Sequence, residues 1–153
     1  MKIVATFSVL MGGPETTDEI TGKLNFRFDK FINQINFPIT PHEQWKDEIV
    51  IIDPNGRYTE QECVQILKEG GLMLPTYEHG IRFALQYGKL IPSFKEKPFI
   101  LFPHESWFNV TDCYRYILSL KRGTNQRLLR LAHCYSGGKF SELCLFAGVR
   151  PRK

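Results

Sequence analysis

Several features that would identify a function class are missing from these 153 residues. No apolar run approaches the ~18 residues that a membrane-spanning helix needs, so the sequence predicts no membrane span. The four cysteines form neither a C-x-x-C pair nor another zinc-ligand spacing. No G-x-G-x-x-G, P-loop, G-x-S-x-G or H-E-x-x-H motif occurs. The common sequence signatures of nucleotide binding, serine hydrolysis and zinc catalysis are therefore excluded.

A concentration of positive charge is missing as well. The net charge is +4, and the basic side chains are spread along the chain apart from the closing Arg150, Arg152 and Lys153, which argues against a nucleic-acid partner. The apolar segment 3–11 is short and has no A-x-A cleavage site, so we expect a first strand there rather than a signal peptide. The expected compartment is the cytoplasm, where thiols stay reduced.

The stretch that organises the chain, residues 57–88, predicts two amphipathic helices. Thr59 and Glu62 form a capping box, so the first helix should begin at Glu60 and end at the glycines that follow Glu69. Thr76 can cap the second helix. The corner between them, residues 72–76, contains three consecutive apolar side chains, and we expect it to be buried where both helices pack against one sheet.

The flanking segments predict further strands and helices around these two helices. We expect strands at 2–10, 48–53 and 98–102, a short helical piece carrying Trp45, a helix from Asn109 or Thr111 to Arg122, and a hairpin whose arms are 127–135 and 139–149. Segment 18–37 fits a helix and a strand equally well. With no internal repeat or linker, residues 1–153 are predicted to form one α+β domain, with the two central helices packed on short mixed or antiparallel strands.

Two kinds of candidate site lie on the predicted hairpin. Cys134 and Cys144 would face one another across it, which allows a redox pair, with reduced and packed thiols as the alternative. Arg127, His133 and Tyr135 would share one face, and cationic and aromatic side chains of this kind often carry binding energy. We therefore expect ligand recognition there, together with the loop at residues 90–97.

Two histidines follow a proline in the sequence P-H-E, namely His42 and His104. A histidine–carboxylate metal site could be built from such pairs. Because neither copy has a supporting third ligand nearby in the sequence, we interpret both as surface turns.

Short segments along the chain occur in an order that is similar to a known family. These segments are Phe7 with Met11-Gly12, Phe37-Pro38-Ile39-Thr40 with Gln44-Trp45, residues 58–63, residues 70–78, Asn109-Val110-Thr111-Asp112, Arg127-Leu128-Leu129-Arg130, and Gly148-Val149-Arg150. Together they resemble the sulfatase-modifying-factor family, whose formylglycine-generating enzymes have a C-type-lectin-like fold. The resemblance implies that fold for this chain.

The resemblance also implies metal sites and an activity. It places a structural Ca²⁺ at Asn109 and Asp112, although Asn109 could instead cap a helix whose first turn carries Asp112. It implies copper-dependent cysteine oxidation, for which Cys134 and Cys144 are the candidates. However, the family's R-G-G-S is replaced by residues 130–133, and its C-x4-C pair is not reproduced.

We consider three functional hypotheses, of which the first two follow from this comparison. The first is a non-catalytic lectin-like binding domain that recognises a protein or glycan ligand, because the fold signature is present and the catalytic motif is not. The second is a copper-dependent, formylglycine-generating-like enzyme. The third is an accessory or structural protein of a mobile element.

Overall fold

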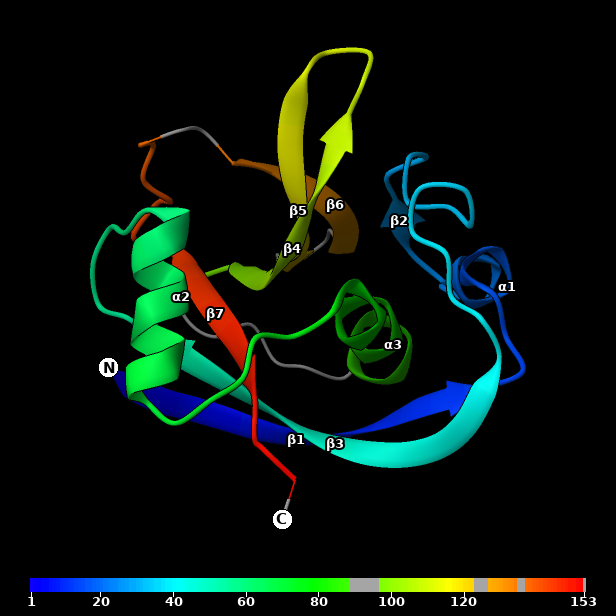
Figure 1. The fold of residues 1–153 in the computed structure, drawn as a ribbon, viewed down its shortest axis with the longest axis horizontal. Coiled ribbons are helices and arrows are strands. Elements are labelled where there is room, and N and C mark those ends of the chain that lie inside the picture. The colour runs from blue at the N-terminus through cyan, green and yellow to red at the C-terminus, as the bar shows by residue number, and fades with distance from the viewer. Residues whose placement is uncertain (89–96, 123–126, 135–136, 153) are drawn as a thin grey trace.

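A mixed sheet of seven strands forms the centre of the computed structural model, which describes residues 1–88, 97–122, 127–134 and 137–152 (Figure 1). The strands lie in the order β1-β3-β7-β4-β5-β6-β2, and the pairs β4–β7 and β2–β6 are parallel. In chain order the elements are β1 (Lys2–Gly13), α1 (Thr17–Gly22), β2 (Arg27–Phe28), β3 (His42–Asp53), α2 (Glu60–Glu69), α3 (Tyr77–Tyr87), β4 (Phe99–Asn109), β5 (Tyr114–Arg122), β6 (Arg127–Cys134) and β7 (Cys144–Val149). The predicted single α+β domain is confirmed.

Helices cover both faces of the sheet. Strand β3 shows this directly, because Ile49 and Ile51 pack in the cluster that contains α1 and α3, whereas Val50 and Ile52 pack in the cluster that contains α2. All four side chains are fully buried, as expected for a strand that is covered on both sides. Figure 1 shows α2 and α3 on opposite sides of β7.

Both central helices begin where the sequence predicts. Thr59 Oγ1 accepts the backbone amide of Glu62 at 3.1 Å, and the Glu62 carboxylate accepts that of Thr59 at 3.0 Å. The predicted start at Glu60 is confirmed. Thr76 caps α3 in the same manner, with His79 in the position that glutamate or glutamine usually takes.

The corner between the helices is buried only in part. Leu72 and Pro75 are buried, but Met73 is 47% exposed and Leu74 is 36% exposed, so the expectation of a wholly buried corner is wrong. Met73 forms two backbone hydrogen bonds with Val149, at 2.8 and 2.9 Å. The corner therefore pairs with β7 through Met73 and carries the chain from one face of the sheet to the other, with the consecutive side chains of Met73 and Leu74 exposed.

Two predicted helical segments are strands. The segment around Trp45 belongs to β3, which pairs with β1 along nearly its whole length. The predicted helix that ends at Arg122 is replaced by β5, which pairs with β4 on one side and with β6 on the other. Pairing with neighbouring strands outweighs the helical spacing of the apolar residues here. The undecided segment 18–37 contains most of the short helix α1 and the two-residue strand β2.

The predicted hairpin of the last two strands is wrong. Strand β6 pairs with β5 and β2, and β7 pairs with β3 and β4, so two strands separate them in the sheet. The glycines at 137–138 thus belong to a longer connection and not to a tight turn. The predicted recognition loop at 90–97 lies outside the described residues except for Lys97.

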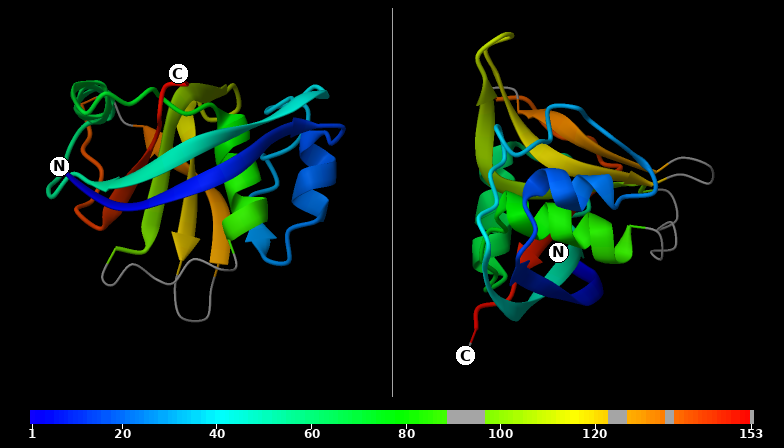
Figure 2. Two further views of the ribbon diagram at one scale, coloured as in Figure 1. Left: turned by 90° about the horizontal axis from the view of Figure 1, so that it is seen from below. Right: turned by 90° about the vertical axis from the view of Figure 1, so that its right-hand side faces the viewer.

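Helix α3 lies beside β1 (Figure 2), and its side chains form hydrogen bonds with the free edge of that strand. The carboxylate of Glu78 accepts the amide of Gly12 at 3.2 Å. The side chain of Gln86 accepts the amide of Leu10 at 2.9 Å and donates to its carbonyl at 2.7 Å. The hydroxyl of Tyr87 donates to the carbonyl of Ser8. An unpaired strand edge is a template for association with another chain, and here helix side chains take the place of a neighbouring strand. None of the described helices has the length and apolar character needed to cross a membrane.

Candidate functional site: an aromatic pocket

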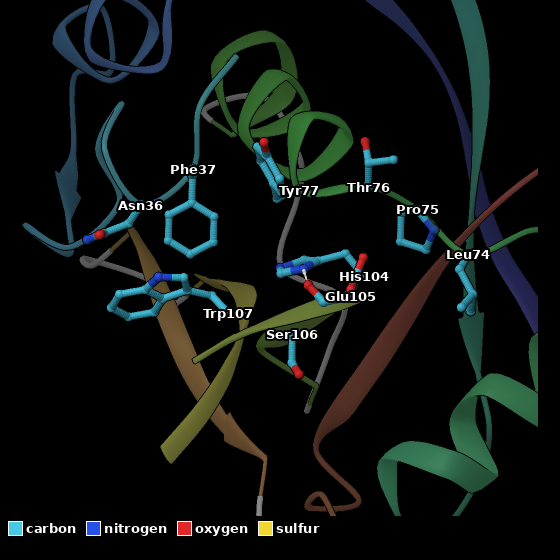
Figure 3. Close-up of a pocket in the computed structure, with 10 residues that line it drawn as sticks. All are labelled: Asn36, Phe37, Leu74, Pro75, Thr76, Tyr77, His104, Glu105, Ser106 and Trp107. Carbon is cyan, nitrogen blue, oxygen red and sulfur yellow. Dashed lines mark hydrogen bonds between the residues drawn. The ribbon is translucent and has the colours of Figure 1, made fainter. Parts of the chain in front are cut away.

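A pocket of about 500 Å³ opens beside the start of α3 (Figure 3). Three segments build it: residues 36–37 before β3, residues 74–77 at the start of α3, and residues 104–107 in β4. The lining residues are Asn36, Phe37, Leu74, Pro75, Thr76, Tyr77, His104, Glu105, Ser106 and Trp107. The volume falls in the range of small-molecule sites, roughly 300–1,000 Å³.

A bulge in β4 places His104 in the wall of this pocket. Phe102 pairs with Leu118 and Trp107 pairs with Tyr116, so four residues of β4 lie opposite one residue of β5. Within the bulge, His104 Nε2 accepts the amide hydrogen of Leu118 at 3.0 Å, and Nδ1 donates to the carbonyl of Glu105 at 2.5 Å. Burial lowers the pKa of His104 to about 4, so the imidazole is neutral at pH 7.

Four rings surround the pocket at steep angles to one another. The planes of Phe37, Tyr77 and His104 are inclined by 72°, 80° and 87° in their three pairings, and their centroids lie 5.4 to 6.2 Å apart. Trp107 stands 5.5 Å from Phe37 at 48° and forms the next wall. Figure 3 shows the four rings close together; Tyr77 and Trp107 are partly exposed, whereas Phe37 and His104 are buried.

Contacts outside the pocket hold these rings in place. The Tyr77 hydroxyl donates a hydrogen bond to the carbonyl of Pro38. The indole of Trp107 lies 6.0 Å from the ring of Phe31 and 6.1 Å from that of Tyr116. A site whose side chains are fixed before binding loses less conformational entropy when a ligand enters.

The lining carries one formal negative charge. Glu105 is exposed at the rim, and no lysine or arginine is among the described residues that line the pocket. Arg115 contacts one lining residue, because it donates to Ser106 Oγ at 3.2 Å, and it also lies 3.5 Å from the carboxylate of Glu60. A phosphate or another anion would thus meet no free positive charge in the pocket, whereas neutral and cationic groups fit the electrostatics.

A hydroxyl–histidine–carboxylate chain lies next to the pocket. His79 Nδ1 is 2.9 Å from Thr76 Oγ1, and His79 Nε2 is 2.8 Å from Asp47. Burial opposes ionisation of Asp47, but hydrogen bonds from Arg152, His79 and Trp45 lower its pKa to about 2.

The same atoms are used to cap α3. His79 Nδ1 also accepts the amide of Thr76 at 2.9 Å, and the Thr76 oxygen accepts the amide of His79 at 3.4 Å. In Figure 3 this hydroxyl points away from His104. We therefore assign the chain of hydrogen bonds to the helix cap and not to nucleophilic catalysis.

Of the three predicted ligand-binding residues, Arg127 and His133 lie near opposite ends of β6. His133 stacks on Tyr116 with centroids 5.3 Å apart and lies 4.1 Å from the ring of Tyr114. Arg127 begins β6, and His133 lies near the other end of that strand. Tyr135 lies outside the described residues.

The cysteine candidates are buried on the face that α2 covers. Cys134 and Cys144 are free thiols that pack in the same cluster as Cys63, but strands β4 and β5 lie between their own strands. Burial raises the pKa of Cys134 to about 12 and also raises that of Cys144. Two buried, protonated thiols on separated strands do not fit a copper site, which needs accessible thiolates.

Asn109 and Asp112 lie close together in the turn between β4 and β5, and not at a helix start. Asn109 accepts the amide of Thr111 at 2.9 Å, and Asp112 accepts the amide of Tyr114 at 2.9 Å and the hydroxyl of Tyr116 at 2.6 Å. Calcium needs six to eight oxygen ligands. The described residues contain no group of three or more metal-ligating side chains, so the calcium site stays a prediction that the turn does not favour.

The aromatic pocket was not found from the sequence. His104 was interpreted as a surface turn, which is wrong because it is 3% exposed. The available signal was the continuous apolar run at 99–102, which stops at Pro103-His104-Glu105 and is followed by apolar residues again from Trp107. Such an interruption inside a strand pattern is typical of a bulge.

The chain matches no protein-family model, no curated protein and no solved structure. The assignment of a function therefore depends on the site itself.

Proposed function

We propose that this chain is a non-catalytic binding domain for a protein or glycan ligand, and that one group of the ligand enters the aromatic pocket. The observation that carries the proposal is a space of about 500 Å³ lined by the partly exposed rings of Tyr77 and Trp107, which pack against the buried ring of Phe37. Apolar ring faces with a few polar groups at the rim are typical of binding sites.

The chemistry of the lining supports binding over catalysis. His104 is neutral, and both of its nitrogens are engaged in hydrogen bonds that hold the bulge. The hydroxyl of Thr76 is engaged in the cap of α3. Neither group has the free lone pair or the activated hydroxyl that a general base or nucleophile needs.

Several expectations from the sequence remain part of this proposal. They are the C-type-lectin-like fold, the relationship to the sulfatase-modifying-factor family, and the cytoplasmic location. The pocket supports the binding hypothesis without them, because its argument uses only the geometry of the described residues. The cysteine-oxidising alternative loses the facing thiols on which it depended.

A ligand-observed NMR screen tests the proposal. The probes are fragment-sized compounds that include monosaccharides, free amino acids and amino acids with methylated side chains. We expect a set of these compounds to bind, to compete with one another, and to lose binding in Trp107→Ala. The matched control is Phe108→Ala, since Phe108 is the next residue in β4, is 50% exposed and does not line the pocket.

Folding of both variants is checked by thermal unfolding before they are compared. If Trp107→Ala is unstable, Leu74→Trp replaces it, because Leu74 is partly exposed at the rim and a larger side chain would fill the entrance. Compounds that bind equally well to the variant and to the wild type, or a screen without any binder, would contradict the proposal.

A further inference from the structure

Two cationic side chains lie over the ring of Phe99 at the start of β4. The guanidinium carbon of Arg130 is 4.7 Å from the ring centroid, and the ammonium nitrogen of Lys121 is 6.0 Å from it. Phe99 lies directly opposite Lys121, and residues in this relation share one face of a sheet. Arg130 lies on the far side of β5, opposite Ser119, so its side chain reaches across that strand to the ring.

These two cations have no anionic partner in the part of the chain that the structure describes. No carboxylate there forms an ion pair with either of them. The Nε atom of Arg130 is buried without a hydrogen-bond partner, whereas the two terminal nitrogens of the guanidinium are open to solvent. Both side chains are half-buried. A half-buried cation without a counterion has lost hydration that nothing in the described fold replaces, and a bound anion would replace it.

The same ends of β5 and β6 carry more positive charge. Arg122 and Arg127 lie directly opposite each other, where like charges repel. Burial and the charge of Arg127 lower the pKa of Arg122 to about 10. Lys97 lies two residues before Phe99, but its ammonium group is held by the carboxylate of Asp53 at 2.6 Å. These basic residues come from separate segments, so their concentration was not evident in the sequence.

From these contacts we infer that Lys121 and Arg130 form a binding site for a phosphomonoester group. The planar guanidinium matches two oxygens of a phosphate, and the lysine ammonium supplies a second positive charge. Because both charges approach one ring, they lie within roughly one Debye length, about 10 Å in 0.1 M salt, and attract one ligand together. Two unpaired cations match the nearly two negative charges that a phosphomonoester carries at about pH 7.

The site is separate from the aromatic pocket, and the inference goes beyond the proposed function. None of its residues lines the pocket, whose part of β4 is the segment 104–107. The two sites differ in charge as well, because the pocket carries a carboxylate and its described lining contains no lysine or arginine. Phe99 holds both cationic groups before a ligand arrives, so little conformational entropy is lost when they bind.

Methyl phosphate, dimethyl phosphate and trimethyl phosphate test the inference, since they share one core and differ in charge. Binding is measured by phosphorus NMR titration at low ionic strength and about pH 8, where the monoester carries two negative charges. We expect methyl phosphate to bind at least ~3-fold more tightly than dimethyl phosphate, and trimethyl phosphate not to bind. Added salt should weaken the binding.

Variants that remove one charge each locate the site. Arg130→Gln and Lys121→Gln should each weaken the binding of methyl phosphate by ~3-fold or more. Lys46→Gln is the matched control, because Lys46 is exposed on β3 and its loss changes the net charge equally; it should bind like the wild type. Arg130→Lys keeps the charge without the planar fork and should bind with intermediate affinity. Thermal unfolding checks each variant, and Lys121→Gln decides if Arg130→Gln does not fold.

A phosphomonoester can belong to a small molecule or to a phosphorylated side chain. Adenosine monophosphate and N-acetyl-phosphoserine-N-methylamide represent these two sources. Tighter binding of the first indicates a small-molecule ligand, and tighter binding of the second indicates a phosphorylated protein. Either result supports the inference, provided that Arg130→Gln weakens the binding.

Three results would overturn the inference, and none of them bears on the aromatic pocket. Equal weakening in Lys46→Gln and in Arg130→Gln would show that only the net charge attracts the ligand. Dimethyl phosphate that binds as tightly as methyl phosphate would point to a phosphodiester chain such as a nucleic acid. Absence of methyl phosphate binding at low ionic strength would show that the two cations form no site.

Discussion

The imidazole of His104 accepts the backbone amide hydrogen of Leu118 across the bulge in β4, at a distance of 3.0 Å. A side chain thus satisfies a buried amide at the point where β4 departs from regular pairing with β5. An unpaired buried amide would cost roughly 1–3 kcal/mol. The same hydrogen bond fixes one wall of the aromatic pocket, so the stability of the sheet and the geometry of the site depend on one residue.

Protonation of His104 should destabilise the fold. Its pKa is about 4 in the folded protein and near 6.5 when unfolded, so the unfolded state binds more protons between these values. Its contribution is therefore complete above about pH 6.5 and is lost as the pH falls toward 4. We expect urea unfolding of the wild type to show a loss of up to ~3 kcal/mol over this range relative to His104→Gln. If the free energy of unfolding depends on pH in the same way in the wild type and in His104→Gln, the lowered pKa of His104 is contradicted.

His42 provides a control of opposite sign. Its hydrogen bond to Glu78 raises its pKa, so its contribution is complete below about pH 6.5 and is lost as the pH rises through the folded value. We expect His42→Gln to show a steeper loss of stability on acidification than the wild type. A shallower profile would mean that the ion pair with Glu78 does not form.

Removing the side-chain amide group of Gln86 should expose the edge of β1. Gln86→Ala deletes two hydrogen bonds to Leu10, and we expect a loss of ~1–2 kcal/mol in the free energy of unfolding together with increased self-association. Gln65→Ala is the control, because Gln65 is exposed on α2 and its side chain donates a hydrogen bond to Glu69 of the same helix. Sedimentation velocity measures the association. An unchanged oligomeric state in Gln86→Ala would show that the helix does not protect this edge.

Thiol reactivity separates the binding hypothesis from the cysteine-oxidising one. Cys63, Cys134 and Cys144 are buried and Cys113 is exposed. We expect Ellman's reagent to modify one thiol rapidly in the native protein and all four after denaturation, and we expect Cys113→Ser to abolish the rapid phase. Rapid native modification of Cys134 or Cys144 would favour the enzyme.

Calcium should have no effect on the turn between β4 and β5. The oxygens of Asn109 and Asp112 already accept hydrogen bonds from Thr111, Tyr114 and Tyr116. We expect the wild type to have the same melting temperature in the presence of calcium and of a chelator. The melting temperature of Asp112→Asn should likewise be the same under the two conditions. A higher melting temperature in calcium that Asp112→Asn abolishes would instead establish the metal site predicted from the family resemblance.

The parts of the fold that local sequence determines could be predicted. The capping residues Thr59 and Thr76 lie next to the amides that they cap, so the starts of α2 and α3 follow from short segments alone. Strand β3 was recognised from the run of β-branched residues at its end, although its first half was interpreted as helical.

Features that depend on contacts between distant segments could not be predicted. The segment that ends at Arg122 is predicted to be a helix, but it forms β5, in which Ile117 and Leu118 point to opposite faces of the sheet and enter different clusters. Likewise, the rings of Phe37, Tyr77 and Trp107 come from separate segments that only the completed fold brings together. Strand order decides both outcomes, and spacing within one segment carries little information about it.

Intermolecular nuclear Overhauser effects from the protons of a fragment that binds the pocket test the central claim most directly. The partly exposed rings that line the pocket predict effects to the protons of Tyr77 and Trp107, and these should disappear in Leu74→Trp and persist in Phe108→Ala. Tyr114 serves as an internal control, because it is 50% exposed on the surface and does not line the pocket. Effects to Tyr114 alone, or none to Tyr77 and Trp107 at a saturating concentration of the fragment, would contradict the assignment of this pocket as the binding site.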